Sequence, residues 1–448
     1  MNNNSIALLS IINDNKKFSM NKDLNGGYGT ADDFGNHPIT KLIGYIRKKS
    51  VKIPLLSLAY VQAILLKKKY EVKYFEGSMP GRFDIYIIWG SIVDHKYENY
   101  IAGQIKSKYP DSKVGFIGGF PSVEPKIYDN ADFIIIGEPE SFFMNEFENK
   151  EQLNGNVIVK SICDFNTLPT PSFNGFPINT YKYKPALNIK PFITLQATKG
   201  CPYSCRYYCT YPISEGIKVR STSAEKIVDD IIRLKKKYNI KAIQFRDPIF
   251  GIDSKFVIEF CNEMINKNVN IKWGMETRLD LLNEDLIKSM FNAGLRSINV
   301  GIETNDIDVA KINKRKLVQE SHQEWIIKFC DKLGVKIVAF YMMGFDNDTI
   351  ETVNNMIEYA KKLNTPLARF SVQTPYPGTG YYDKLKKENK LTSDNFEEYT
   401  QFNLVYEHNN LDKKDIAKLL KKAYKEYYLR PKYILKFIKW KIRELYPN

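Results

Sequence analysis

The residues best suited to chemistry are three cysteines within nine positions of one another, Cys201, Cys205 and Cys209, in the segment TKGCPYSCRYYCTYP. The chain's other three cysteines are scattered: Cys163, Cys261 and Cys330. In a reducing compartment, closely spaced cysteines indicate metal binding rather than disulfide bonds. Thiolates are the soft ligands that iron–sulfur clusters require. The loop therefore predicts a site where three thiolates hold three irons of a [4Fe–4S] cluster and the fourth iron stays open to another ligand.

Two other interpretations of this loop are open. A zinc site would need a fourth Cys or His, and none lies nearby in the sequence. The remaining alternative is three loop cysteines that hold no metal, in a degenerate enzyme or a binding protein.

Charged residues follow later predicted strands. Asp247, in FRDPIF, is either a ligand contact or a cap of the turn that ends its strand. Glu303, in GIET, ends another strand, where a buried carboxylate without a role would be costly. Arg315, in KINKRK, is either a counter-charge for the site or a solvated loop cation.

These residues require a scaffold of alternating strands and helices. We expect strands at residues 193–198, 242–246, 271–276, 297–302, 336–343 and 368–373, with helices that include 224–237, 255–267 and 349–362. Six strand–helix alternations suit an open or partial TIM-like (β/α)6 barrel, whose chemistry lies at the carboxyl ends of its strands. The cysteine loop and the charged residues fall at such ends.

A second α/β unit precedes the barrel. Residues 6–12, 84–89, 113–117 and 132–136 are short, nearly continuous apolar runs, and residues 55–69 have helical apolar spacing. Such runs are typical of a parallel sheet covered on both faces, so we expect a doubly wound, Rossmann-like domain. The predicted organisation is this domain at 1–160, a proline-punctuated linker at 161–191, the barrel at 192–382 and a basic helical region at 383–448.

The motifs together resemble the radical S-adenosylmethionine (SAM) superfamily, and in particular its cobalamin-linked branch. The resemblance rests on the cysteine loop, FRDPIF, GIET, YMMGFDND and QTPYPGT, in that order, and is strong over residues 192–382. The usual cysteine spacing is C-x3-C-x2-C, whereas this chain has C-x3-C-x3-C because Tyr207 and Tyr208 both precede Cys209. The extra residue must be absorbed as a bulge, or it would misplace the third thiolate.

The resemblance implies a [4Fe–4S] cluster that binds SAM and cleaves it to a 5′-deoxyadenosyl radical, with electrons from a flavodoxin- or ferredoxin-type donor. It implies that Asp247 and Glu303 contact SAM, with Arg315 as a counter-charge. In the amino-terminal domain it implies cobalamin, with Gly118 and Gly119 along its tail and Ser91 near the corrin. The D-x-H-x-x-G signature is missing, so we expect no histidine on cobalt; the alternative is a scaffold domain that binds no cobalamin.

The formal net charge is +15, and residues 412–448 hold twelve Lys and Arg against four Asp and Glu. No nucleic-acid-binding module is recognisable, so we expect no nucleic acid partner. Residues 432–446 place Ile434, Phe437, Ile438, Ile442 and Leu445 on one helical stripe among lysines. Such a helix either packs on the barrel or lies on an anionic membrane.

The sequence has no signal peptide pattern and no apolar run long enough to span a bilayer, so we expect a cytoplasmic protein, peripheral to the membrane if the tail binds lipid. The predicted activity is cobalamin-dependent methylation of an unactivated carbon on a small, hydrophobic or lipid-like substrate. The alternatives are a radical rearrangement or cyclisation without methyl transfer, and a cluster-free binding protein. The sequence does not identify the substrate.

Overall fold

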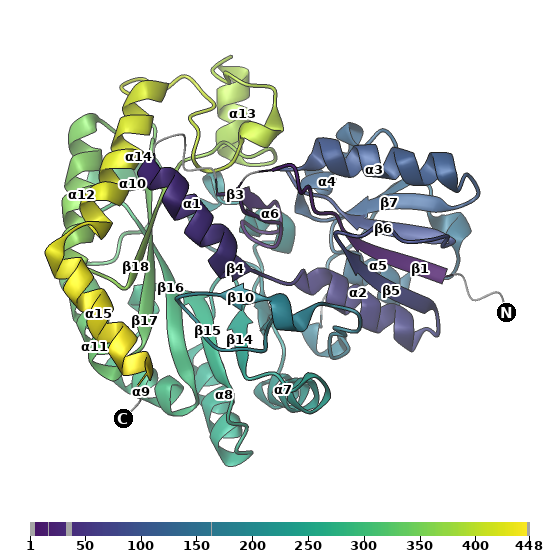
Figure 1. The fold of residues 1–448 in the computed structure, drawn as a ribbon, viewed down its shortest axis with the longest axis horizontal. Coiled ribbons are helices and arrows are strands. Elements are labelled where there is room, and N and C mark those ends of the chain that lie inside the picture. The colour runs from purple at the N-terminus through teal and green to yellow at the C-terminus, as the bar shows by residue number, and fades with distance from the viewer. Residues whose placement is uncertain (1–4, 17, 33–37, 163, 446–448) are drawn as a thin grey trace.

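The computed structural model describes residues 5–16, 18–32, 38–162 and 164–445, which form two α/β lobes and a helical cap (Figure 1). Cys163 and Tyr446 lie outside these residues, as does the side chain of Leu445. None of the described helices is long and apolar enough to cross a bilayer.

The amino-terminal lobe is a six-stranded parallel sheet in the order β5-β1-β6-β7-β8-β9. Its strands are β1 (Ser5–Ser10), β5 (Glu71–Glu76), β6 (Ile85–Trp89), β7 (Lys113–Ile117), β8 (Phe133–Ile136) and β9 (Gly155–Ile158). Its helices are α2 (Leu56–Lys67), α3 (His95–Lys108), α4 (Gly119–Val123) and α5 (Pro139–Asn145). Every residue of β6 is buried, as expected for a strand covered on both faces. The predicted doubly wound fold is confirmed.

The second lobe is a six-stranded parallel sheet in strict chain order, the open barrel predicted from the sequence. Its strands are β11 (Phe192–Leu195), β14 (Ala242–Phe245), β15 (Lys272–Thr277), β16 (Leu295–Glu303), β17 (Lys336–Met343) and β18 (Leu367–Val372). Its helices are α6 (Tyr211–Glu215), α7 (Ala224–Tyr238), α8 (Ser254–Asn266), α9 (Glu284–Asn292), α10 (Ile307–Ile312), α11 (Glu320–Leu333) and α12 (Ile350–Leu363). A small hairpin of β12 (Thr198–Lys199) and β13 (Arg220–Ser221) flanks the cysteine loop.

Three further segments cover the barrel. Helix α1 (Pro38–Ser50) crosses in front of it, and β4 (Val51–Lys52) pairs with β10 (Lys182–Tyr183) of the proline-rich linker (Figure 1). The carboxyl-terminal region forms α13 (Gly380–Lys387), α14 (Lys413–Tyr428) and α15 (Pro431–Leu445). Helix α14 packs on β18, where the hydroxyl of Tyr424 donates to the carbonyl oxygen of Phe370 at 2.9 Å.

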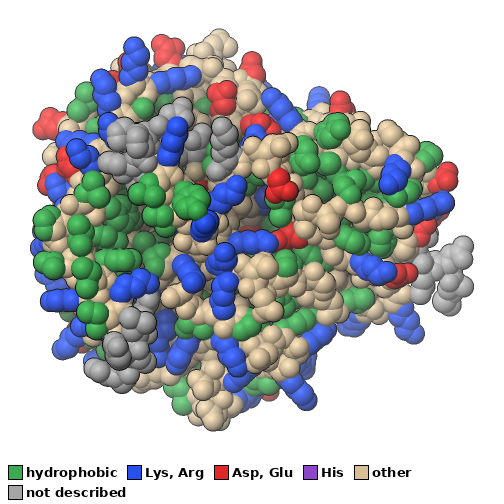
Figure 2. Space-filling view, in the orientation of Figure 1, with side chains coloured by type: hydrophobic (Ala, Val, Ile, Leu, Met, Phe, Trp, Pro, Cys, Tyr) green, Lys and Arg blue, Asp and Glu red, His purple; other side chains and the backbone are tan. Residues whose placement is uncertain are grey.

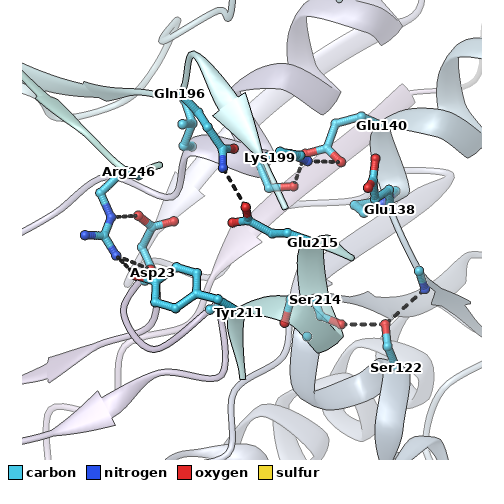
Figure 3. A pocket seen from close by; sticks show the side chains of 18 of the residues that line it. Asp23, Ser122, Glu138, Glu140, Gln196, Lys199, Tyr211, Ser214, Glu215 and Arg246 are labelled. Atoms are coloured by element: carbon cyan, nitrogen blue, oxygen red, sulfur yellow. Dashed lines mark hydrogen bonds and ion pairs between the residues drawn. The ribbon is translucent and has the colours of Figure 1, made fainter. Parts of the chain in front are cut away.

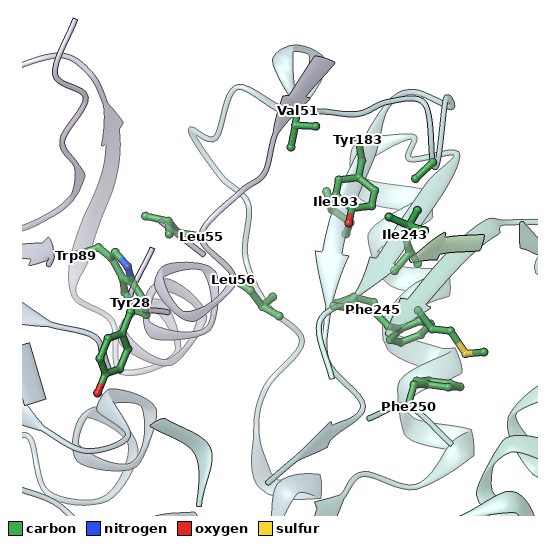
Figure 4. Close-up of a cluster of buried hydrophobic side chains, with 14 of the residues drawn as sticks. Tyr28, Val51, Leu55, Leu56, Trp89, Tyr183, Ile193, Ile243, Phe245 and Phe250 are labelled. Carbon is green, nitrogen blue, oxygen red and sulfur yellow. The ribbon is translucent and has the colours of Figure 1, made fainter. Parts of the chain in front are cut away.

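The lobes meet through the hairpin of β2 (Met20–Asn21) and β3 (Thr30–Ala31). The hydroxyl of Tyr28 donates to Pro377 O at 2.9 Å, and that of Thr30 donates to Thr400 O at 3.1 Å. Figure 4 shows Leu56, at the start of α2, between the Tyr28–Trp89 pair of the first lobe and the β14 side chains of the second. The apolar core is therefore continuous from one lobe to the other.

Candidate active site

The cysteine loop follows β11 and lies at the carboxyl end of the barrel sheet. Cys201, Cys205 and Cys209 all line one cavity of about 250 Å³, which we call the cysteine cavity. The backbone N–H of Cys201 donates to Gly216 O at 3.1 Å, which fixes the start of the loop. The structure therefore brings together the three residues that the sequence predicted as cluster ligands.

The extra residue of the C-x3-C-x3-C motif is absorbed by a helical turn. The backbone N–H groups of Tyr208 and Cys209 both donate to Cys205 O at 3.0 Å, after a 3-10 turn over Ser204–Tyr207. Tyr207 turns away from the cavity, with its ring 5.7 Å from that of Tyr381. Cys205 and Cys209 are thus separated by one helical turn, and both line the cysteine cavity.

Burial raises the pKa of the Cys201 thiol to about 11, and it also raises the pKa values of Cys205 and Cys209. Arg315 and Arg278 partly oppose the shift at Cys205. In the described part of the chain no three His, Cys, Asp or Glu side chains converge on a single ion. A cluster does not need such convergence, because each thiolate binds its own iron. The donor set and the common cavity fit a [4Fe–4S] cluster.

Glu303 and Arg315 line the cysteine cavity together with the thiols, and Arg315 lies 3.5 Å from the hydroxyl of Tyr208 in the cysteine loop. Glu303 sits at a register shift between β16 and β17 with φ of 66°, a backbone region that non-glycine residues rarely adopt. An Arg315 guanidinium nitrogen lies 3.8 Å from a Glu303 carboxylate oxygen, and another donates to Gly301 O. A side chain at Gly301 would collide with the Glu303 carboxylate and press on the Arg315 guanidinium, so glycine there leaves room for both groups. Strain of this kind is typical of functional sites.

Asp247 does not line the cysteine cavity. It is fully buried, and its carboxylate accepts from the backbone N–H of Ala197 at 3.1 Å and from the hydroxyl of Thr198 at 2.8 Å. This geometry gives Asp247 a structural contact with the segment that follows the neighbouring strand β11, and not a position at the cavity surface. Ala197 and Thr198 lead directly into the cysteine loop, so their contacts with Asp247 fix the position of that loop.

A second cavity of about 100 Å³, the glycine-loop cavity, lies where the carboxyl ends of β6, β7 and β8 face the cysteine loop (Figure 3). Gly118 and Gly119 line it, as predicted for a loop that approaches a ligand. Gly118 has φ of 126°, which favours glycine. Trp89 Nε1 and Ser214 Oγ are buried near it without hydrogen-bond partners among the described residues.

Ser91 lies outside this cavity. Its hydroxyl donates to Glu98 Oε1 at 2.7 Å and its backbone N–H donates to Glu98 Oε2 at 2.8 Å. Lys22 pairs with the same carboxylate at 2.5 Å. Ser91 is fully buried in this network, so the structure gives its hydroxyl a structural contact and not a position at the cavity surface.

Arg246 lines the glycine-loop cavity and contacts two residues that line the cysteine cavity. The sequence did not identify it as a site residue. Its Nε lies 3.2 Å from Asp23 Oδ2 of the first lobe, and it pairs with Glu276 of β15. It also donates to the hydroxyl of Tyr211, a residue that lines both cavities, at 3.1 Å (Figure 3). Arg246 stands beside Asp247 at the end of a predicted strand. This position was the signal in the sequence that could have identified it as a site residue.

A cluster of charges on the far side of the glycine-loop cavity was also missed. Lys199 lies 3.5 Å from Glu140 (Figure 3). Arg220 lies 2.6 Å from Glu138. Burial raises the pKa of Glu215 to about 8, against the opposing charge of Lys199. Glu138 and Glu140 follow β8 directly, so their place after a predicted strand was the available signal.

An open parallel barrel with a three-thiol loop after its first strand, and with Glu303 and Arg315 in the same cavity, is an arrangement that fits an iron–sulfur enzyme. Residues 195–360 match the model of the Radical SAM superfamily. The chain therefore contains a radical SAM domain, and it is an enzyme whose domain implies a [4Fe–4S] cluster and SAM as cofactors.

Proteins of similar sequence and structure extend over both lobes. An uncharacterised methyltransferase of Pyrococcus horikoshii is 26% identical over 420 residues, which cover 86% of this chain and 90% of that protein. The bacteriochlorophyllide d C-12(1)-methyltransferase of Chlorobaculum tepidum is 21% identical and covers 82% of this chain and 81% of its own. The structure of the radical SAM methyltransferase TsrM of Kitasatospora setae, with cobalamin and a [4Fe–4S] cluster bound, matches 96% of this chain and 90% of its own with a TM-score of 0.64 and 12% identity. The last likeness shows a shared fold.

Proposed function

We propose that the protein is a cobalamin-dependent radical SAM methyltransferase that acts on an unactivated carbon of a small, hydrophobic or lipid-like substrate. The observation that carries the proposal is the meeting of two ligand cavities at Tyr211 and Arg246, one lined by three thiols and the other by a glycine loop. The methyltransferase names of the relatives that span both lobes support it.

Cys201, Cys205 and Cys209 would hold the cluster, and Glu303 with Arg315 would hold SAM at the open iron. When bound, the cluster and SAM supply a 5′-deoxyadenosyl radical, and cobalamin supplies a methyl group. The Glu303 carboxylate can accept from an amino group, and Arg315 has a buried Nε without a partner among the described residues. Asp247 would act indirectly, by fixing the segment that leads into the cysteine loop.

The glycine loop suits cobalamin, but the space beside it is small. Gly118, Gly119 and the unpartnered Trp89 and Ser214 offer close backbone approach and hydrogen bonds. Yet about 100 Å³ is less than an ordinary ligand pocket of about 300–1,000 Å³. Gly27 packs on Trp89 and would clash with it if it carried a side chain. We infer that the glycine loop would contact the tail of cobalamin, since the cavity does not enclose the whole cofactor.

The chain's own residues would orient the reaction and keep water out. Tyr211 lines both cavities, and the ion pairs of Arg246 with Asp23 and Glu276 connect the loop of the β2–β3 hairpin to the barrel. Hydrogen abstraction by a radical requires no acid or base, so no such residue is assigned.

A hydrophobic substrate would find apolar contacts in the cysteine cavity at Leu24, Ile249, Phe340 and Met342. The same cavity also offers polar atoms at Asn299 and Tyr183 and several charged side chains. A flavodoxin- or ferredoxin-type protein would supply electrons. The basic helix α15 would bring the enzyme to a membrane surface.

The test is a product assay with reconstituted enzyme and candidate apolar substrates. Methylation predicts release of both 5′-deoxyadenosine and S-adenosylhomocysteine and a product heavier by one methyl group. Deoxyadenosine without S-adenosylhomocysteine, with an isomerised or cyclised product, would select the alternative of rearrangement. Absence of iron after anaerobic reconstitution would select the cluster-free binding protein.

A further inference from the structure

Helices α1 and α15 leave apolar side chains exposed after each has packed against the protein. On α15, Tyr433 is buried and its hydroxyl donates to Pro366 O at 2.9 Å, while Trp440 Nε1 donates to Asp331 Oδ1 at 3.0 Å. Phe437 packs beside them against the core. Packing on the barrel therefore uses one face of α15. Phe437 belongs to that face, whereas the sequence pattern groups it in one stripe with Ile434, Ile438 and Ile442.

The opposite face of α15 is aliphatic and open to solvent. Ile434, Leu435, Ile438 and Ile442 are 45%, 63%, 49% and 52% exposed. Three of them are spaced by four residues, so they form one stripe along the helix. A helix that only packed on the barrel would carry polar residues here.

Helix α1 repeats this arrangement. Leu42, Tyr45 and Ile46, at helical spacing, are 58%, 56% and 53% exposed. Arg47 of the same helix lines the cysteine cavity and lies 3.2 Å from the buried carboxylate of Asp32. One side of α1 thus faces the active site while another presents apolar side chains to the exterior.

The two apolar stripes lie on the same side of the molecule. Both helices face the viewer in Figure 1, and in the same orientation Figure 2 shows hydrophobic side chains gathered over this half, among Lys and Arg. Exposed aliphatic residues elsewhere, such as Ile158 and Ile217, are isolated and need no explanation.

The charge around these stripes is basic. The sequence of α1 holds four basic residues and no acidic one, and that of α15 holds five basic residues and one acidic. Lys41, Lys49, Lys432 and Lys439 are exposed on these helices. Apolar stripes bordered by lysines match the interface of an anionic bilayer, where aliphatic side chains enter the acyl region and ammonium groups meet lipid phosphates.

We propose that α1 and α15 together form a monotopic binding face for anionic lipid membranes. The membrane-binding face then includes α1, whose Arg47 lines the cysteine cavity. On the proposed function, an apolar substrate dissolved in the bilayer would then reach the cavity beside Arg47 without crossing water.

Vesicle sedimentation of the full-length reconstituted protein tests the face without any catalytic readout, so its failure is distinct from failure of the proposed reaction. Wild type should bind phosphatidylcholine vesicles that contain phosphatidylglycerol, and salt should weaken this binding. L42Q with I46Q on α1, and I438Q with I442Q on α15, should each weaken it about tenfold or more. K432Q with K439Q should weaken it about fivefold per lysine on anionic vesicles only.

The matched control is I258Q with I265Q on α8, since both isoleucines are 48% exposed on a helix outside the face. This variant should bind vesicles like wild type, and circular dichroism should show that all variants are folded. Vesicle binding that is unchanged in L42Q with I46Q would overturn the proposal that α1 and α15 form one membrane-binding face. A wild type that ignores vesicles but forms a dimer, lost in the α1 or α15 variant, would assign the face to a second copy of the chain.

Discussion

The three thiols of the cysteine loop are expected to act as a unit, because each binds one iron of the same cluster. Replacement of Cys201, Cys205 or Cys209 by Ala should lower the iron content from about four per chain to well below one and abolish the thiolate-to-iron absorbance. Cys261→Ala is the matched control, since Cys261 is fully buried on α8, away from the cavity. Iron retained after all three cysteines are replaced by Ala would contradict their assignment as cluster ligands.

Glu303 and Asp247 are both acidic residues that follow barrel strands, yet their surroundings predict opposite effects. Glu303→Gln should weaken SAM binding about tenfold or more, because a charge-assisted hydrogen bond becomes a neutral one, and iron content should stay at the wild-type level. Equilibrium dialysis with SAM measures this.

The matched variant is Asp247→Asn. It should lower the free energy of unfolding by about 1–3 kcal/mol, since its amide would face the backbone donors of Ala197 and Thr198. Strong loss of SAM affinity in a fully stable Asp247→Asn protein would reverse these assignments.

Sequence reasoning located the cysteines and Glu303 because their signals are local: spacing within a loop and position at a strand end. It could not choose between the two roles of Asp247, because the donors from Ala197 and Thr198 come from a different strand. The same holds for Ser91, whose partner Glu98 is set by the packing of α3.

At the scale of elements, the hairpin β2–β3 is fixed to the first lobe by a buried ion network. Lys22 lies 2.5 Å from Glu98 and 3.5 Å from Asp94, both fully buried. Lys22→Met should lower the free energy of unfolding by about 3–5 kcal/mol, because it leaves buried carboxylates without their counter-charge. Urea denaturation measures the change.

Lys73→Met is the control for the loss of a lysine ion pair. Lys73 and its partner Glu71 are 60% and 59% exposed, so this change should cost at most about 1 kcal/mol. Equal effects of the two substitutions would show that the Lys22 network does not anchor the hairpin.

The regular strands and helices were predictable because each carries its own apolar periodicity, as the buried run of β6 and the amphipathic α7 show. The pairing of β4 with β10 was not, because a two-residue ladder between distant segments leaves no periodic signal. In α15 the pattern predicted an amphipathic helix, but only packing shows that Phe437 faces the barrel and Ile438 faces out.

At the scale of the whole molecule, the proposed chemistry depends on how the two lobes are placed relative to each other. Tyr211 of α6, Asp23 of the first lobe and Glu276 of β15 converge on Arg246, and Tyr211 lines both cavities. No sequence pattern encodes this convergence, because its members come from three distant segments. On the proposed function, it would bring a ligand of the glycine loop near a ligand of the cysteine loop.

Cobalamin should bind at the glycine loop with no protein nitrogen on cobalt. Gly118 and Gly119 line that cavity, and no histidine does so among the described residues. His95, the histidine nearest in sequence to the β6 end, is buried with its Nδ1 3.0 Å from Ile92 O, and burial lowers its pKa. Electron paramagnetic resonance of the cob(II)alamin form should therefore show no nitrogen superhyperfine splitting from the protein.

The matched pair for this measurement is Gly119→Val and His95→Gln. A valine at Gly119 would collide with Ser214 and Tyr28 and should abolish cobalamin binding while iron content stays unchanged. His95→Gln keeps a donor toward Ile92 and should leave both binding and spectrum as in wild type. Nitrogen splitting that disappears in His95→Gln would mean that the loop after β6 rearranges to ligate cobalt. Cobalamin bound equally well by Gly119→Val would place the cofactor away from the glycine loop, and the two cavities would then serve a single SAM-dependent radical step.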